Sequence, residues 1–301
     1  MKVGVPIGAG LVLEIGEEPG DARDYPTARL QKGLLLVDAG QSLAEEGVGF
    51  GVPVLKRGMR TVFPGRRDVA CRRDGSTWKV TATYEMDLIE RLTKVRGRSG
   101  PRTPGPDERL VRSRTLYAAK DALAALHRRF PRLRDPLAAA STAVRRAFGW
   151  VTTYEQTESC GAIAVTHVVR PGDEGADGGG GDVVETRVSV TVDLSGLTGA
   201  GITEVVVMNE QGARCFERYE DSDGAVLRGA GIGTWDEVGA ARASLVSAGH
   251  RVAFSLGQAP GARLFRGREL VGARLAWVGF GYSLLPTRGS FGYELTIERT
   301  P

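Results

Sequence analysis

Carboxylate and amide side chains stand together after a strongly apolar run at positions 205–208. Asn209, Glu210 and Gln211 follow that run directly and precede Gly212. Amides of this kind hold a substrate hydroxyl while a neighbouring carboxylate, here Glu210, moves a proton as a general acid or base. The same residue types are common in tight turns, so the pattern also fits an Asn/Gly turn between two strands.

A second group of candidate residues occupies positions 233–237, with the sequence GTWDE. Trp235 offers a flat apolar platform with one N–H donor, and Asp236 and Glu237 offer carboxylates. Such a trio suits a sugar, whose ring stacks on the aromatic surface while its hydroxyls take hydrogen bonds. The hypothesis makes Asp236 the second catalytic carboxylate beside Glu210, and Trp235 and Glu237 substrate-binding residues. Thr234, three residues before Glu237, also matches the capping box of a helix start.

Arginines form the third group, in the segment GARLFRGREL at 261–270. Strand alternation places Arg266 and Arg268 on one face. Two convergent guanidinium groups would bind a carboxylate in a bidentate manner, such as that of a uronic acid. The alternative is a solvated strand edge that carries arginine. With Asn209 and Gln211, these arginines complete the predicted substrate-binding set.

Several other chemistries lack their sequence signals. There is no G-x-S-x-G elbow, P-loop or H-E-x-x-H motif. The three histidines are isolated, and the three cysteines contain no C-x-x-C pair. The sequence therefore predicts neither a metal site nor a cofactor. The scattered cysteines and the absence of a leader cleavage site lead to the expectation of a cytoplasmic protein.

The elements that must position these residues are mostly strands. The run at 77–84 and the run at 183–194 alternate apolar and polar residues, which is typical of half-buried antiparallel strands. Many such runs at short intervals predict one mainly β domain over residues 1–301, a large antiparallel β-sandwich. Helical spacing recurs only at about 108–149, with a stop at Pro131 and a new start at Asp135, which predicts an inserted helical hairpin.

Charge is unevenly distributed along the 301 residues. The net charge is only +4, which argues against a nucleic-acid partner. The segment 91–146 nevertheless holds fifteen basic and four acidic residues, so the rest of the chain is acidic. A basic hairpin of this kind suggests an alternative function, a non-catalytic module that docks on an acidic protein or a membrane surface. The sequence gives no indication of the oligomeric state.

At the level of fold class, the strand-rich parts resemble galactose-mutarotase-like β-supersandwich proteins, which act on carbohydrates. The resemblance rests on an all-β chain of this length with acids, tryptophans and arginines. This sequence lacks a matching histidine pair, so no residue roles are carried over. The leading prediction is a carbohydrate-active enzyme of the hydrolase, lyase or epimerase type. Its expected ligand is a saccharide or a ligand that contains a uronic acid.

Overall fold

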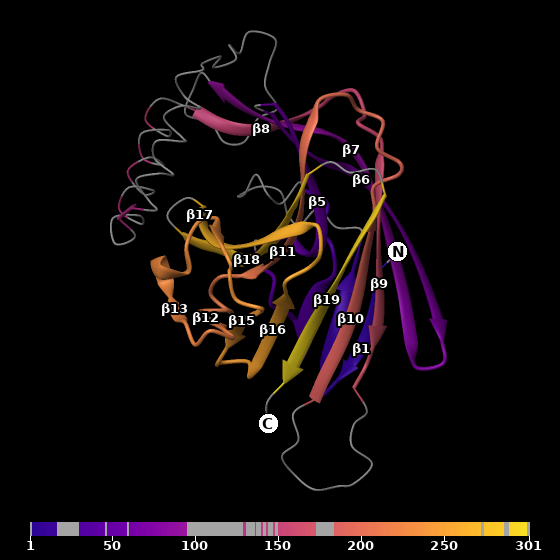
Figure 1. Cartoon of the computed structure of the whole chain (residues 1–301), viewed down its shortest axis with the longest axis vertical. Helices are drawn as coiled ribbons and strands as arrows, with labels where there is room; N and C mark the ends of the chain where they lie inside the picture. The colour runs from indigo at the N-terminus through magenta and orange to yellow at the C-terminus, as the bar shows by residue number, and fades with distance from the viewer. Residues whose placement is uncertain are drawn as a thin grey trace, which may run out of the picture.

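The part of the protein that the structure describes is built almost entirely of antiparallel strands, as predicted (Figure 1). The computed structural model describes residues 2–16, 30–45, 47–58, 60–94, 150–172, 184–271, 274–285 and 289–299, and six isolated positions between 95 and 149. A small sheet contains, in order, β1 (Val3–Gly8), β2 (Leu11–Ile15), β3 (Leu35–Asp38) and β4 (Gln41–Ser42). A second, fifteen-stranded sheet contains the other strands.

The first half of the large sheet runs in the order β13 (Val226–Arg228), β12 (Arg218–Asp221), β15 (Arg242–Ser247), β16 (Val252–Gly257), β19 (Ser290–Arg299), β10 (Val184–Asp193) and β9 (Ala162–Arg170). The second half continues with β7 (Thr77–Lys94), β6 (Arg60–Asp74), β5 (Gly49–Arg57), β11 (Ile202–Gly212), β18 (Arg274–Leu284), β17 (Ala262–Val271) and β14 (Asp236–Glu237). In addition, β8 (Trp150–Gln156) pairs with β7. A 3-10 turn, η3, spans Gly229–Ile232.

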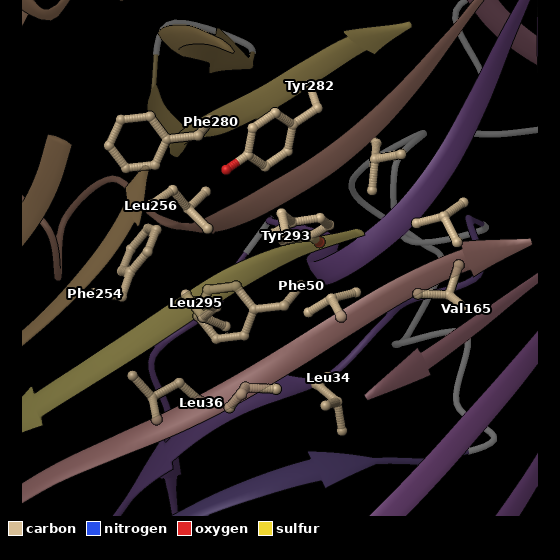
Figure 2. Packing of buried hydrophobic residues seen from close by; sticks show 14 of the residues in the cluster. Leu34, Leu36, Phe50, Val165, Phe254, Leu256, Phe280, Tyr282, Tyr293 and Leu295 are labelled. Carbon is tan, nitrogen blue, oxygen red and sulfur yellow. The ribbon is translucent and has the colours of Figure 1, made fainter. Parts of the chain in front are cut away.

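The large sheet curls so that its two halves face each other and form a sandwich. Phe254 on β16 makes edge-to-face contacts with Phe50 on β5 and with Phe280 on β18, at ring-centroid distances of 5.2 and 5.8 Å. These strands are far apart in the sheet order, so the contacts join opposite layers. Figure 2 shows this apolar packing between the layers. The core cluster also includes side chains of β1, β2 and β3, so the small sheet packs on the same core.

Strand alternation produces the buried faces. On β10, Val188, Val190 and Val192 are buried, whereas Arg187 before them and Thr191 between the last two are exposed. The alternation predicted from the sequence at 183–194 is therefore confirmed. Burying every second residue of a strand is what allows one face to join the core while the other meets solvent.

The predicted helical hairpin at about 108–149 is not supported. Nearly all of this range lies outside the described residues. Ala140, Ala143 and Ala147 are isolated described positions with helical backbone. The hairpin was predicted from local signals alone, the helical periodicity with a stop at Pro131 and a start at Asp135, whereas in the described chain the dominant interactions are strand pairings. None of the helices in the described ranges is long and apolar enough to cross a membrane.

An ionic contact joins the small sheet to the large one. The Asp38 carboxylate, at the end of β3, lies 2.9 Å from His250 Nδ1 and 2.6 Å from an Arg299 guanidinium nitrogen at the end of β19. Burial alone would raise the pKa of Asp38, but the hydrogen bonds to His250 and Arg299 hold it below its usual value. The first strands are thereby tied to the last one.

A polar side chain is enclosed in the core where β5 bulges. Gly51 has a φ of +78°, and the pairing of β5 with β11 shifts register there. A Cβ at this position would lie 2.5 Å from His167 Nε2, so the bulge requires glycine. His167 is fully buried, and neither of its ring nitrogens has a partner with hydrogen-bond geometry. The nearby backbone of Val80 and Phe50 favours the protonated imidazole. Burial nevertheless dominates and lowers the pKa of His167 to about 4.

This histidine should make the fold sensitive to acid. The unfolded chain takes up a proton near pH 6.5, whereas folded His167 takes one up only near pH 4. Stability from this group is therefore complete above pH 6.5 and is lost as the pH falls toward 4. We expect a total loss of about 3 kcal/mol in the free energy of unfolding. Denaturant titrations across this pH range, on the wild type and on His167→Gln, measure it; an equally steep decline in the variant would contradict the assignment.

Candidate functional site

Four neighbouring strands bring together the three residue clusters that the sequence singled out. β11, β18, β17 and β14 lie side by side in this order, and we call them the site ribbon. β11 carries the cluster at 209–211, β17 carries the two arginines, and β14 contains the acidic pair that follows Trp235. β11, β18 and β17 can be followed near the middle of Figure 1.

Two alternative interpretations of these clusters are wrong. β11 continues without interruption through Gly212, so Asn209, Glu210 and Gln211 belong to a strand and not to a turn. Asp236 and Glu237 form strand β14 instead of the first turn of a helix, so the capping-box interpretation fails. In both places strand pairing overrides the local signal, because each segment finds a partner elsewhere in the chain.

The register of the site ribbon decides which side chains share a face. Directly opposed residues of antiparallel strands point to the same face, and successive residues point to opposite faces. One row contains Glu210, Gly279 and Gly267. The next row contains Asn209, Phe280, Arg266 and Asp236. Because Phe280 belongs to the core, we call its side of the ribbon the inner face and the side of Glu210 the outer face.

Glu210 lies beside two glycine residues on the outer face. Its side chain is 4% exposed. Gly279 opposite it needs to be glycine, because a Cβ there would lie 2.7 Å from the Glu210 Cα atom. Gly267 continues the row, so two neighbouring strands present no side chain next to the carboxylate. The segment at 234–235 lies over this glycine backbone, because a Cβ at Gly267 would come within 2.3 Å of the Thr234 carbonyl oxygen.

Trp235 supplies an aromatic surface on the same face. Its indole is stacked on the Phe265 ring, with centroids 5.2 Å apart and an interplanar angle of 2°. The edge of the indole lies over Gly281, where a Cβ would come within 2.2 Å of a Trp235 ring carbon. Phe265 and Gly281 are opposed residues two rows away from Glu210, so this row belongs to the same face. The outer face thus combines a carboxylate with a half-buried indole.

Charged groups border this aromatic pair. The Arg263 guanidinium carbon lies 5.1 Å from the centroid of the Phe265 ring. Arg263 also forms a 3.8 Å ion pair with Glu237. Glu237 is opposite Phe265 in the register and therefore belongs to the outer face. Both side chains are more than half exposed, so they can exchange this weak contact for a polar ligand.

Asn209 has a structural task on the inner face. Its Oδ1 atom accepts hydrogen bonds from the Gly51 N–H at 3.2 Å and from the Tyr293 hydroxyl at 2.8 Å. Burial keeps the pKa of Tyr293 well above its usual value, so this hydroxyl stays a donor. Asn209 therefore connects β11 with the bulge of β5 and, across the sandwich, with β19. Its oxygen is occupied by the protein itself.

The two arginines share the inner face, as alternation predicted, and Arg266 meets an aromatic ring there. Its guanidinium carbon lies 4.8 Å from the centroid of the Tyr219 ring. The Tyr219 hydroxyl donates a 2.8 Å hydrogen bond to Asp221. Burial would raise the pKa of Asp221, but hydrogen bonds from the Ala225 amide and from Tyr219 hold it below its usual value. Arg266 is thus part of a charged cluster with a neutral phenol and an ionised carboxylate.

Gln211 and Arg268 complete the inner face. They lie in one row on either side of Val278, and both are buried. Neither the oxygen nor the nitrogen of the Gln211 amide has a hydrogen-bond partner, which costs stability for a fully buried group. The predicted substrate-binding residues therefore fall into two sets. Trp235 and Glu237 lie on the outer face. The inner face holds Asn209, Gln211, Arg266 and Arg268.

The ribbon does not bring Glu210 and Asp236 together. The two residues lie on opposite faces, and β11 and β14 are three strand steps apart. At about 4.8 Å per step, the backbones are roughly 14 Å apart. Carboxylate pairs that flank a glycosidic bond are separated by about 5–9.5 Å. A bond held beside Glu210 would therefore be out of reach of Asp236.

Some residues of the outer face were missed by sequence reasoning. Phe265, Gly279 and Gly281 have no chemical function of their own, so they carried no functional signal. The alternation of glycine with aromatic residues in GFGY at 279–282 was an available clue to a bare strand face. Among the described residues, no group of three or more His, Cys, Asp or Glu side chains is arranged to hold a metal ion.

Comparison with solved structures gives matches of low sequence identity, each with a TM-score below 0.5. An α-N-acetylgalactosaminidase from Bifidobacterium bifidum aligns with 99% of this chain at 10% identity and a TM-score of 0.44, and this chain covers 36% of that enzyme. The protein HI1317 aligns at 8% identity and a TM-score of 0.33, with 99% of this chain and 98% of that one covered. A galactose mutarotase-like protein from Lactobacillus casei aligns over 99% of both chains at 10% identity and a TM-score of 0.28.

A galactose mutarotase-like protein, the class that the sequence resembles, is among these matches. No known protein family and no curated protein matches the sequence. Fold alone does not determine activity, so the function is argued from the residues of the site ribbon.

Proposed function

We propose that the protein is a carbohydrate-active enzyme that moves a proton with one carboxylate, Glu210, on the outer face of the site ribbon. The observation that carries the proposal is the shared face of Glu210 and the Trp235–Phe265 pair. Aromatic platforms accept the apolar face of a sugar ring, and Glu210 lies on the same face two rows away along the strands. A carboxylate on the face that holds the sugar can act as a general acid or base.

The separation of Glu210 from Asp236 favours some reactions over others. Hydrolysis of a glycosidic bond ordinarily uses two carboxylates on either side of that bond, and Asp236 lies on the inner face. A single carboxylate can take the proton from the carbon beside a sugar carboxylate and pass it to the glycosidic oxygen as the C–O bond breaks, which is a lyase-type reaction. In an epimerase-type reaction the same proton returns to that carbon on its other face. We therefore favour an epimerase- or lyase-type reaction. Asp236 would influence it only through the β14–β17 pairing.

The expected ligand is a saccharide, including one with a uronic acid. Arg263 borders the aromatic pair on the outer face and is the cation best placed to meet a sugar carboxylate. Arg266 and Arg268 lie on the inner face. They would therefore support the ribbon instead of contacting a sugar held beside Trp235.

A panel of neutral and uronate-containing saccharides tests the proposal. NMR spectra of each saccharide with the protein would reveal epimerised or unsaturated products, and titration would reveal binding. Trp235→Ala should weaken binding of the active saccharide, because the ring would lose its stacking surface. Turnover that is unaffected in this variant would contradict the outer-face site. Binding of saccharides without any turnover would indicate a lectin-like binding module and not an enzyme.

A further inference from the structure

A hollow lies on the solvent side of β6, β7 and β9, away from the site ribbon. It has a volume of about 350 Å³ and is lined by Arg72, Asp74, Thr77, Lys79 and Val168. The three strands pair directly in the order β6–β7–β9, and the β6–β7 hairpin is drawn in purple in Figure 1. The volume falls within the range of small-molecule sites.

Two cations oppose each other in this hollow. Arg72 on β6 is the register partner of Lys79 on β7. Like charges at directly opposed positions of a sheet destabilise the pairing. Within the described chain neither side chain forms an ion pair, and both are exposed. Among the described residues, the repulsion between Arg72 and Lys79 is therefore not relieved by an ion pair.

The residues around this pair keep the hollow positively charged and add an apolar wall and a hydroxyl group. Val168 is the register partner of Lys79 and offers an apolar wall. Arg170, two residues further along β9, is exposed on the same face of the sheet. Thr77 supplies a hydroxyl, and Asp74 is the one carboxylate in the lining. Three cations and one carboxylate leave a net positive charge around a cavity larger than an ion.

We propose that this hollow binds a small oxyanionic ligand, with a carboxylate, sulfate or phosphate group held between Arg72 and Lys79. A guanidinium group and an ammonium group both donate hydrogen bonds to such an oxyanion. The bound anion removes the repulsion between the two strands, and Thr77 and Val168 contact the remainder of an organic ligand. The site shares no residue with the Glu210 face and does not depend on the proposed enzymatic function.

Thermal unfolding with low-millimolar probes at constant ionic strength tests the site. Galacturonate and inorganic sulfate represent an organic and an inorganic source of the oxyanion, with galactose and chloride as controls. We expect a saturable rise in melting temperature with galacturonate, sulfate or both, and none with galactose or chloride. Low concentrations avoid the general stabilisation that sulfate produces by exclusion from protein surfaces. No saturable rise with either oxyanion, or an equal rise with galactose, overturns the proposal.

A pair of charge-reversal variants locates the effect. Arg72→Glu places a carboxylate opposite Lys79, so the ligand-free protein should melt at a higher temperature and no longer respond to the oxyanion. Arg60→Glu is the matched control, because Arg60 opposes Arg57 at the other end of β6. This control should also gain stability but keep the response. A response that persists in Arg72→Glu, or that disappears in Arg60→Glu, overturns the assignment.

A third variant tests the proposal without relying on the folding of Arg72→Glu. Lys79→Gln removes one of the two cations without introducing a new charge. Calorimetric titration of this variant with the probe that stabilises the wild type should show binding at least tenfold weaker. Unchanged affinity in Lys79→Gln overturns the proposal even where Arg72→Glu does not fold.

Discussion

Glu210→Gln should lower turnover of the saccharide substrate by about 10²–10⁴-fold, the range expected for loss of a general acid or base. Glutamine keeps the size of the side chain, but it neither accepts nor returns a proton at neutral pH. Circular dichroism should stay close to that of the wild type, because glutamine fills the same space as the Glu210 side chain, which is 4% exposed. Steady-state rates of the purified variant, compared with the wild type, measure the effect.

Two further variants separate this mechanism from its alternatives. Glu294→Gln changes an exposed glutamate on β19 and should leave turnover unchanged. Asp236→Asn should cause a much smaller loss than Glu210→Gln, because Asp236 lies on the inner face, three strand steps away. Equal losses in Glu210→Gln and Asp236→Asn would restore a paired mechanism and would contradict the division of the ribbon into two faces.

Phe254→Ala should produce the largest loss of stability, about 3–5 kcal/mol in the free energy of unfolding. Phe254 is fully buried and makes edge-to-face contacts with Phe50, Phe216 and Phe280, with centroids 5.0–5.8 Å apart. Those partners come from β5, from the segment after β11 and from β18. Truncation would therefore leave a cavity between the two layers of the sandwich (Figure 2).

Equilibrium unfolding in denaturant measures this loss. Phe254→Leu serves as the matched variant, because it keeps most of the buried volume and loses chiefly the ring contacts. We expect its loss to be clearly smaller than that of Phe254→Ala. A Phe254→Ala protein that unfolds at the wild-type denaturant concentration would show that the two layers do not pack through this residue.

The strands were predictable from the sequence because their signal is local. Alternation in 183–194 predicts a strand with one buried face, and β10 has that face. The positions of Arg266 and Arg268 on one face follow from the same period of two. Each of these inferences needs only neighbouring residues.

The composition of the site was only partly predictable, because it depends on pairing between distant segments. Nothing in the segment at 205–212 indicates that β18 lies beside it and β14 three steps away. The register assigns Glu210 and Asp236 to different faces, and a shift of one residue would have put them on the same face. The sequence can therefore nominate the residues of a site, but the partner strands determine which of them meet.

The place of β19 inside the large sheet has a consequence for synthesis of the protein. This strand, formed by Ser290–Arg299, pairs with β10 on one side and β16 on the other. A growing chain on the ribosome has neither of those pairings until residues 290–299 have emerged. Until then β10 and β16 present two open edges, which are ready templates for pairing with another chain. Nascent chains of this protein should accordingly depend on chaperones, and ribosome-bound chains that stop before residue 290 should aggregate on release.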